Sequence, residues 1–157
     1  MIILALDSGL ERTGYALVEK KNTLKNFKYI TSGVFFTSNK SSLPLRIFKI
    51  YNFLNKLIEQ YKPDCFVLEK LFFFANKKTA ISVSQVQGSV LLLAEQKKIN
   101  LVFLTPLQVK QTVTGYGRAD KKGVKKIIHL TLPETKKITQ DDEIDAIAIA
   151  VTYCLLN

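Results

Sequence analysis

The sequence has few of the residues that build disulfides, zinc sites and histidine-based catalytic sites. In 157 residues it has two cysteines, one histidine and no tryptophan. Cys65 and Cys154 lie in apolar surroundings, and neither belongs to a C-x-x-C or zinc-type spacing. We therefore expect buried free thiols in a reducing compartment. His129 lies near the apolar side of a predicted helix, where a structural role is expected.

Long apolar runs, internal repeats, low-complexity tracts and linkers rich in proline or glycine are also missing. The longest apolar stretches are too short to cross a bilayer, and the chain does not begin with a charged segment that leads to a cleavage site. We therefore expect a cytoplasmic protein with no membrane partner. Hydrophobic residues make up 47% of the sequence, which argues against disorder and predicts a single domain over residues 1–157.

Negative charge is the scarcer of the two signs. The sequence has 13 aspartates and glutamates against 23 lysines and arginines, for a formal net charge of +10. Such an excess favours a polyanionic partner such as nucleic acid, because binding releases the counterions of the polyanion. It also fits a soluble basic protein that binds no polyanion, so charge alone leaves both alternatives open.

Hydrophobic periodicity predicts a strand meander followed by alternating helices and strands. Polar turns at 8–12 and 20–26 separate the first three strands, which indicates antiparallel pairing. The later alternation of helices and strands is typical of a mixed five-stranded α/β sheet flanked by helices. The predicted strands are 2–7, 13–20, 27–37, 65–69 and 101–104, and the predicted helices are 43–61, 77–97, 106–112, 119–130 and 140–155.

Four carboxylates lie at the edges of apolar runs that should be buried. Asp7 and Glu69 each end a predicted strand, while Asp142 and Asp145 begin the last helix, just before its apolar run. Ionised groups at the edge of a core are costly unless they are paired or bind a cation. Strand ends gather at one edge of an open sheet, and residues three apart share a helix face. We therefore expect the four carboxylates to converge.

Four converging carboxylates suit two divalent cations about 3.5–4 Å apart. One ion would generate the attacking hydroxide, and the other would stabilise the leaving oxygen. Hard oxygen ligands without a cluster of histidines or cysteines favour Mg²⁺, with Mn²⁺ as a substitute.

Each carboxylate also has a simpler interpretation. Asp7 can start a turn, and Glu69 can be a surface residue at a strand end. Negative charge in the first turn of a helix suits the helix dipole without any metal, and this applies to Asp142. Asp141 would share a helix face with Asp145 nearly as well as Asp142 does, so spacing alone leaves that choice open.

Six segments resemble the RuvC family of Holliday-junction resolvases, within the RNase H-like nuclease superfamily. The match runs almost end to end, and the segment Val109-Lys110-Gln111 is especially informative, because other RNase H-like nucleases lack it. The resemblance implies an RNase H-like fold. The matching segments are 3–9 with 13–15, 63–69 with Phe72, 85–88, 106–115, 119–121 and 142–150.

The resemblance implies a homodimer that binds four-way DNA junctions and cuts opposing strands by paired, symmetric nicks, in DNA recombination and repair. The family's basic residues near the scissile phosphate correspond to Lys110 and Lys121, and its base-stacking aromatic corresponds to Phe72. Branch-migration proteins of the RuvA and RuvB type are further candidate partners. The family's metal-binding catalytic tetrad corresponds to Asp7, Glu69, Asp142 and Asp145.

Further DNA contacts are expected from two loops and from the start of a helix. The segment 115–118 predicts a flexible basic loop in which Arg118 contacts the DNA backbone. Phe72 and Phe73 can stack on unpaired bases, although two of the three phenylalanines at 72–74 can pack in the core instead. Additional phosphate contacts are expected from Asn76, Lys77 and Lys78.

Three positions depart from the family pattern. Ser8 replaces the usual proline, Ala5 the usual glycine, and Lys70 a polar or acidic residue. None of them removes a ligand, but Ser8 predicts a looser turn after Asp7, and Lys70 either weakens metal binding or adds a DNA contact. The leading hypothesis is a junction resolvase. Two alternatives stay open: a less selective RNase H-like nuclease on branched DNA or RNA–DNA hybrids, and a junction-binding protein that does not cut.

Overall fold

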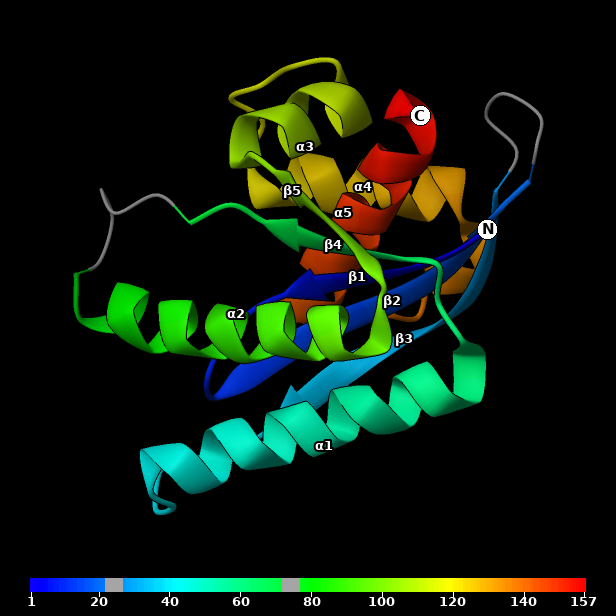
Figure 1. Cartoon of the computed structure of the whole chain (residues 1–157). Helices are drawn as coiled ribbons and strands as arrows, with labels where there is room; N and C mark the ends of the chain where they lie inside the picture. Colours follow the sequence, from blue (N-terminus) through cyan, green and yellow to red (C-terminus); the bar gives the residue numbers. More distant parts are fainter. Residues whose placement is uncertain (22–26, 72–76) are drawn as a thin grey trace.

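Five strands form one mixed sheet in the order β3-β2-β1-β4-β5. The computed structural model describes residues 1–21, 27–71 and 77–157, and of residues 77–79 it describes the backbone only. β1 pairs antiparallel with β2 and parallel with β4, which confirms the predicted RNase H-like sheet (Figure 1). The strands are β1 (Ile2–Asp7), β2 (Arg12–Lys20), β3 (Phe27–Phe36), β4 (Cys65–Glu69) and β5 (Asn100–Leu104).

Helices cover both faces of this sheet (Figure 1). On one face lie α1 (Leu43–Tyr61) and α2 (Lys77–Lys97). The other face is covered by α5 (Asp141–Leu156), with α3 (Pro106–Thr114) and α4 (Lys121–Thr131) packed against it. Every predicted strand and helix is present, so the predicted α/β class is confirmed.

The side chains of β1 enter two cores, because successive residues of a strand point to opposite faces. Leu4 and Leu6 pack in the core under α1 and α2, while Ile3 and Ala5 pack in the core under α5. All four side chains are fully buried. β1 is therefore the central strand of the fold, and its last residue lies at a rigid edge of the sheet.

The helix α3 extends two residues beyond its predicted end, to Thr114. Val113, in the added turn, is buried in the core. Gly115 then ends the helix in the left-handed conformation, with φ of 76°, which a residue without Cβ adopts at little cost. At the other end, Thr105 and Gln108 form a capping box that fixes where the helix begins.

A short 3-10 turn, η1 (Pro133–Thr135), joins α4 to α5 and is absent from the predicted elements. Its Thr135 is fully buried, with Oγ1 3.1 Å from Nδ1 of His129, which supports the structural role expected for that histidine. Cys65 and Cys154 are buried free thiols, as predicted. Within the described residues, none of the helices has the length and apolar character needed to span a bilayer.

Candidate active site

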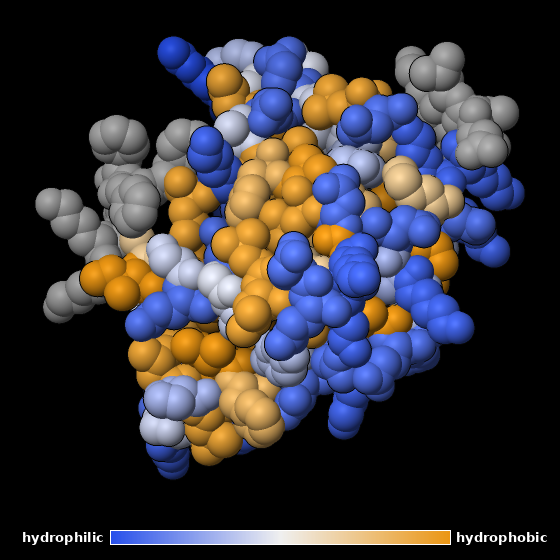
Figure 2. Space-filling view, in the orientation of Figure 1, coloured by the Kyte–Doolittle hydropathy of each residue, from blue (hydrophilic) through white to orange (hydrophobic). Residues whose placement is uncertain are grey.

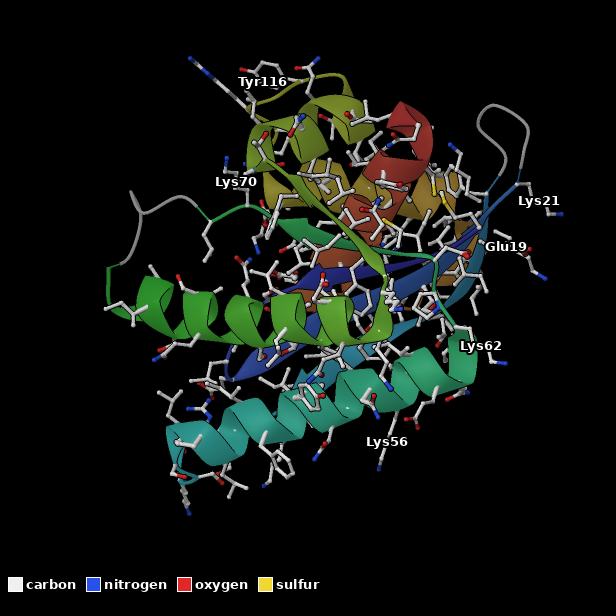
Figure 3. All side chains as sticks on the ribbon, viewed as in Figure 1. Glu19, Lys21, Lys56, Lys62, Lys70 and Tyr116 are labelled. Atoms are coloured by element: carbon white, nitrogen blue, oxygen red, sulfur yellow. The ribbon has the colours of Figure 1, made fainter. Side chains whose placement is uncertain are left out.

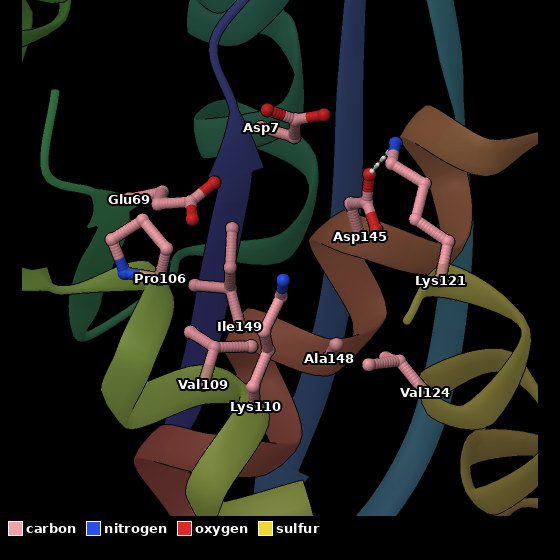
Figure 4. Close-up of a pocket in the computed structure, with 10 residues that line it drawn as sticks. All are labelled: Asp7, Glu69, Pro106, Val109, Lys110, Lys121, Val124, Asp145, Ala148 and Ile149. Atoms are coloured by element: carbon pink, nitrogen blue, oxygen red, sulfur yellow. Dashed lines mark hydrogen bonds and ion pairs between the residues drawn. The ribbon is translucent and has the colours of Figure 1, made fainter. Parts of the chain in front are cut away.

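Two neighbouring parallel strands place the first two predicted carboxylates at one edge of the sheet. Asp7 ends β1 and Glu69 ends β4, and the register pairs Leu6 with Leu68 just before them. Asp145 reaches the same place from the second turn of α5, and the three carboxylates line one cavity of about 360 Å³ (Figure 4). The fold thus brings together three of the four predicted carboxylates from distant parts of the sequence.

The two predicted lysines line the same cavity. Lys110 extends from α3 toward the carboxylates, and Lys121 comes from the first turn of α4 (Figure 4). The Lys121 ammonium donates a hydrogen bond of 2.8 Å to Asp145. This bond raises the pKa of Lys121 and outweighs the opposing effect of burial. The cavity therefore combines acidic and basic groups, as a site for a phosphate and a cation requires.

Crowded negative charge makes ionisation of these carboxylates costly. Burial is the main cause that raises the pKa of Asp7 from its ordinary value of 3.8 to about 7. Among the nearby charges, Asp145, Glu69 and Asp142 raise it further, and Lys121 lowers it. Burial likewise raises the pKa of Glu69, and Asp145 adds to that rise. Positive charge brought into the cavity would relieve this repulsion.

Asp142 lies beside the cavity rather than in its lining. Its carboxylate accepts an ion pair from Nε of Arg12 at 2.7 Å, and its charge contributes to the raised pKa of Asp7. Asp141 is exposed and acts on the pKa of Lys121 instead. Of the two candidates in the first turn of α5, Asp142 is therefore the one whose charge reaches Asp7.

Gly14 allows α5 to lie close to the sheet at the site. It is the register partner of Asp7 across β1 and β2. A Cβ built on Gly14 would lie 1.9 Å from the carbonyl oxygen of Asp142, far closer than any real contact. A residue without Cβ is therefore required for the first turn of α5 to approach β2 this closely. The sequence places Gly14 in a matching segment, but nothing in its spacing predicts this contact.

Gln87 of α2 fixes the end of β4. Its side-chain amide donates a hydrogen bond of 2.9 Å to the backbone carbonyl oxygen of Glu69, and the side chain is buried. Sequence analysis missed Gln87 and Arg12 as residues that support the site. For Gln87 there was a signal, because a polar amide on the sheet-facing side of a helix needs a buried partner.

The departures from the family pattern leave the carboxylates in place. Ser8 is buried after Asp7, and its Oγ has no hydrogen-bond partner among the described residues. Lys70 follows Glu69 but is exposed and does not line the cavity (Figure 3). Neither substitution closes the site.

The other predicted DNA contacts are described unevenly. Arg118 is exposed in the loop between α3 and α4, and Tyr116 in the same loop projects from the surface (Figure 3). Lys77 and Lys78 begin α2, where only their backbone is described. The predicted residues that lie outside the described part of the chain are Phe72, Phe73 and Asn76.

The donors at the cavity fit a hard divalent cation, because the ionisable groups of its described lining are carboxylates and lysines. Across the described residues, however, no three acidic, histidine or cysteine side chains stand close enough together to hold a metal ion. Cationic side chains hold two of the carboxylates instead: Lys121 holds Asp145, and Arg12 holds Asp142. A bound cation would therefore compete with these two ion pairs.

Comparison with known proteins identifies the family. The family model described as crossover junction endodeoxyribonuclease RuvC matches residues 3–153. A relative of that name from Petrotoga mobilis is 45% identical over 153 residues, which cover 98% of this chain and 93% of the relative. One from Caldicellulosiruptor saccharolyticus is 38% identical, over 99% of this chain and 93% of the relative.

Solved structures agree on the fold. The structure of Thermus thermophilus RuvC in complex with a Holliday junction substrate superposes with a TM-score of 0.90, over 99% of this chain and 96% of the other, at 24% identity. A second T. thermophilus RuvC structure gives a TM-score of 0.89, over 99% of this chain and 94% of that one, at 24% identity. Since the family model and the relatives span nearly the whole sequence, the chain belongs to the RuvC family of crossover junction endodeoxyribonucleases.

Proposed function

We propose that this protein is a metal-dependent endonuclease that resolves four-way DNA junctions by paired, symmetric nicks, in DNA recombination and repair. The observation that carries the proposal is the cavity where Asp7, Glu69 and Asp145 meet two lysines, on a protein with a net charge of +10. A compact acidic site on a basic protein suits a phosphodiester held together with cations. Family membership supplies the junction as the expected substrate.

The proposed catalytic groups divide the work between metal binding and charge neutralisation. Two Mg²⁺ ions held by the tetrad Asp7, Glu69, Asp142 and Asp145 would activate a water and stabilise the leaving oxygen. Lys110 and Lys121 neutralise charge that develops on the scissile phosphate. To do so, Lys121 exchanges Asp145 for the phosphate, so its ammonium stays paired in both states.

Substrate binding in this proposal extends beyond the cavity. Arg118, exposed after α3, contacts the DNA backbone together with the lysines at the start of α2, Lys77 and Lys78. Phe72 stacks on a base near the junction centre, with Phe73 and Asn76 beside it. Proteins of the RuvA and RuvB type are proposed as partners at the junction, on family grounds alone.

Paired nicks require two active sites, so we include a homodimer in the proposal, with residues 1–157 as one protomer. An apolar groove of about 540 Å³ runs between α1 and α2. Its walls include Phe48 and Leu92, which are 59% and 57% exposed. Figure 2 shows hydrophobic side chains gathered over this pair of helices. Exposed apolar surface of this kind is typical of protein interfaces.

The test is cleavage of a labelled four-way junction beside a matched linear duplex and an RNA–DNA hybrid, with Mg²⁺ and with EDTA. We expect symmetric nicks that need Mg²⁺, occur on the junction and can be sealed by ligase. Cutting of the hybrid, or of any branched DNA, would favour the less selective nuclease. Binding without nicks would leave a junction-binding protein.

A further inference from the structure

A second cavity, of about 400 Å³, lies where the turn between β1 and β2 meets the N-terminal ends of α1 and α2. These three segments lie together at the left of Figure 1, at the sheet edge where β1 ends. The turn contributes residues 9–12, α1 contributes Arg46, and α2 contributes Ser82 and Val83. Two arginines, Arg12 and Arg46, therefore line a cavity that begins two residues after Asp7.

The structure holds Arg46 in place with donors to spare. Its Nε donates a hydrogen bond of 2.8 Å to Oγ1 of Thr37, and Thr37 donates in turn to the carbonyl oxygen of Leu10, in the turn itself. Thr37 is buried, so the contact is shielded from water. Within residues 1–21, 27–71 and 77–157, the terminal nitrogens of Arg46 make no hydrogen bond. The guanidinium is thus fixed at one edge and open at the other.

Arg12 is fixed in a comparable way. Its Nε pairs with Asp142, and its guanidinium carbon lies 5.6 Å from the ring centre of Phe36. Glu11 also lines the cavity but is exposed, so it reduces the positive charge of the two arginines without cancelling it. Guanidinium groups that are held in position lose little entropy when they bind a partner.

We propose that Arg12 and Arg46 bind a backbone phosphate of the DNA strand, in a subsite next to the catalytic cavity. A guanidinium presents paired N–H donors whose spacing matches two phosphate oxygens. The cavity lies against the turn that directly follows Asp7, so a strand seated at the carboxylates passes close to it. The inference rests on the proposed function, since it takes the DNA substrate as its ligand.

The subsite also links DNA binding to the state of Asp142. Arg12 holds this carboxylate through Nε, and a phosphate in the cavity competes for the same guanidinium. A bound strand therefore weakens the Arg12–Asp142 pair and makes the carboxylate available to a cation. The link makes binding at the subsite and loading of the metal site mutually supportive.

Junction binding measured in EDTA over a series of salt concentrations tests the subsite, because no cutting occurs there. We expect Arg46→Gln to weaken binding several-fold and to reduce the slope of log K against log salt by about 0.9, the loss of one phosphate contact. Arg46→Lys keeps the charge but loses the paired donors, so an intermediate affinity is expected. Lys56→Gln is the matched control, since Lys56 projects from α1 into solvent (Figure 3).

Wild-type affinity and slope in Arg46→Gln, with an unchanged melting temperature, would overturn the subsite. An equal loss in Lys56→Gln would also overturn it, because the effect would then be one of net charge. The proposed function fails separately, by an absence of Mg²⁺-dependent nicks from the wild-type protein. Arg46 has no part in the proposed chemistry, so the two results are independent.

Discussion

Replacing Asp7 with asparagine should stabilise the metal-free protein while abolishing the proposed cleavage. The folded-state pKa of Asp7 is about 7, above its ordinary value of 3.8, so the folded protein holds this proton more tightly than the unfolded chain does. The resulting stability is fully present below pH 3.8 and is lost as the pH rises to about 7. At about 1.4 kcal/mol per pH unit, ionised Asp7 costs about 4 kcal/mol at pH 8 and about 2 kcal/mol at pH 5.

Thermal unfolding in EDTA at pH 5 and pH 8 measures this difference. Asp7→Asn removes the cost, so its melting temperature should exceed that of the wild type by roughly 10 °C at pH 8 and by less at pH 5. Asp141→Asn is the control, because Asp141 is exposed in the first turn of α5, where losing its charge should destabilise slightly. A variant less stable than the wild type at pH 8, or an equal advantage at both pH values, would refute the reasoning.

Three further substitutions test the residues that support the site. Gly14→Ala forces a Cβ against the backbone of α5, so we expect a loss of about 1–3 kcal/mol in unfolding free energy, measured with urea, together with loss of nicking. Gln87→Leu removes the hydrogen bond to the Glu69 carbonyl, so Mg²⁺ affinity measured by calorimetry should fall while the melting temperature changes little; unchanged affinity would contradict a positioning role. Ser8→Ala removes a buried hydroxyl without a partner among the described residues, and a melting temperature above that of the wild type is expected.

The secondary structure could be predicted from the sequence because local patterns decide it. The unbroken apolar run before Asp7 fits a strand buried on both faces, and the observed β1 has the predicted bounds. The end of α3 could not be placed, because it depends on burial of Val113 and on the cap at Gly115. Burial in the core is set by tertiary packing, which the helical period alone does not contain.

The carboxylates of the site were predictable in kind, because acids at the ends of buried runs are costly without a partner. Their immediate partners were not. Arg12 meets Asp142 because β2 lies beside the first turn of α5, and Lys121 meets Asp145 across two helices. Such pairs join residues far apart in sequence, and one sequence without that geometry offers many equivalent lysines and arginines.

The separation between rigid and peripheral elements has a consequence for protein engineering. Asp7 and Glu69 stand on strands whose preceding residues are fully buried, whereas Arg118 and Tyr116 stand on an exposed loop that begins at Gly115. Loops of this kind tolerate insertion and substitution far better than the centre of a sheet does. Libraries confined to the loop could therefore reprogram which DNA shape is accepted, with the hydrolytic machinery left as an unaltered cassette.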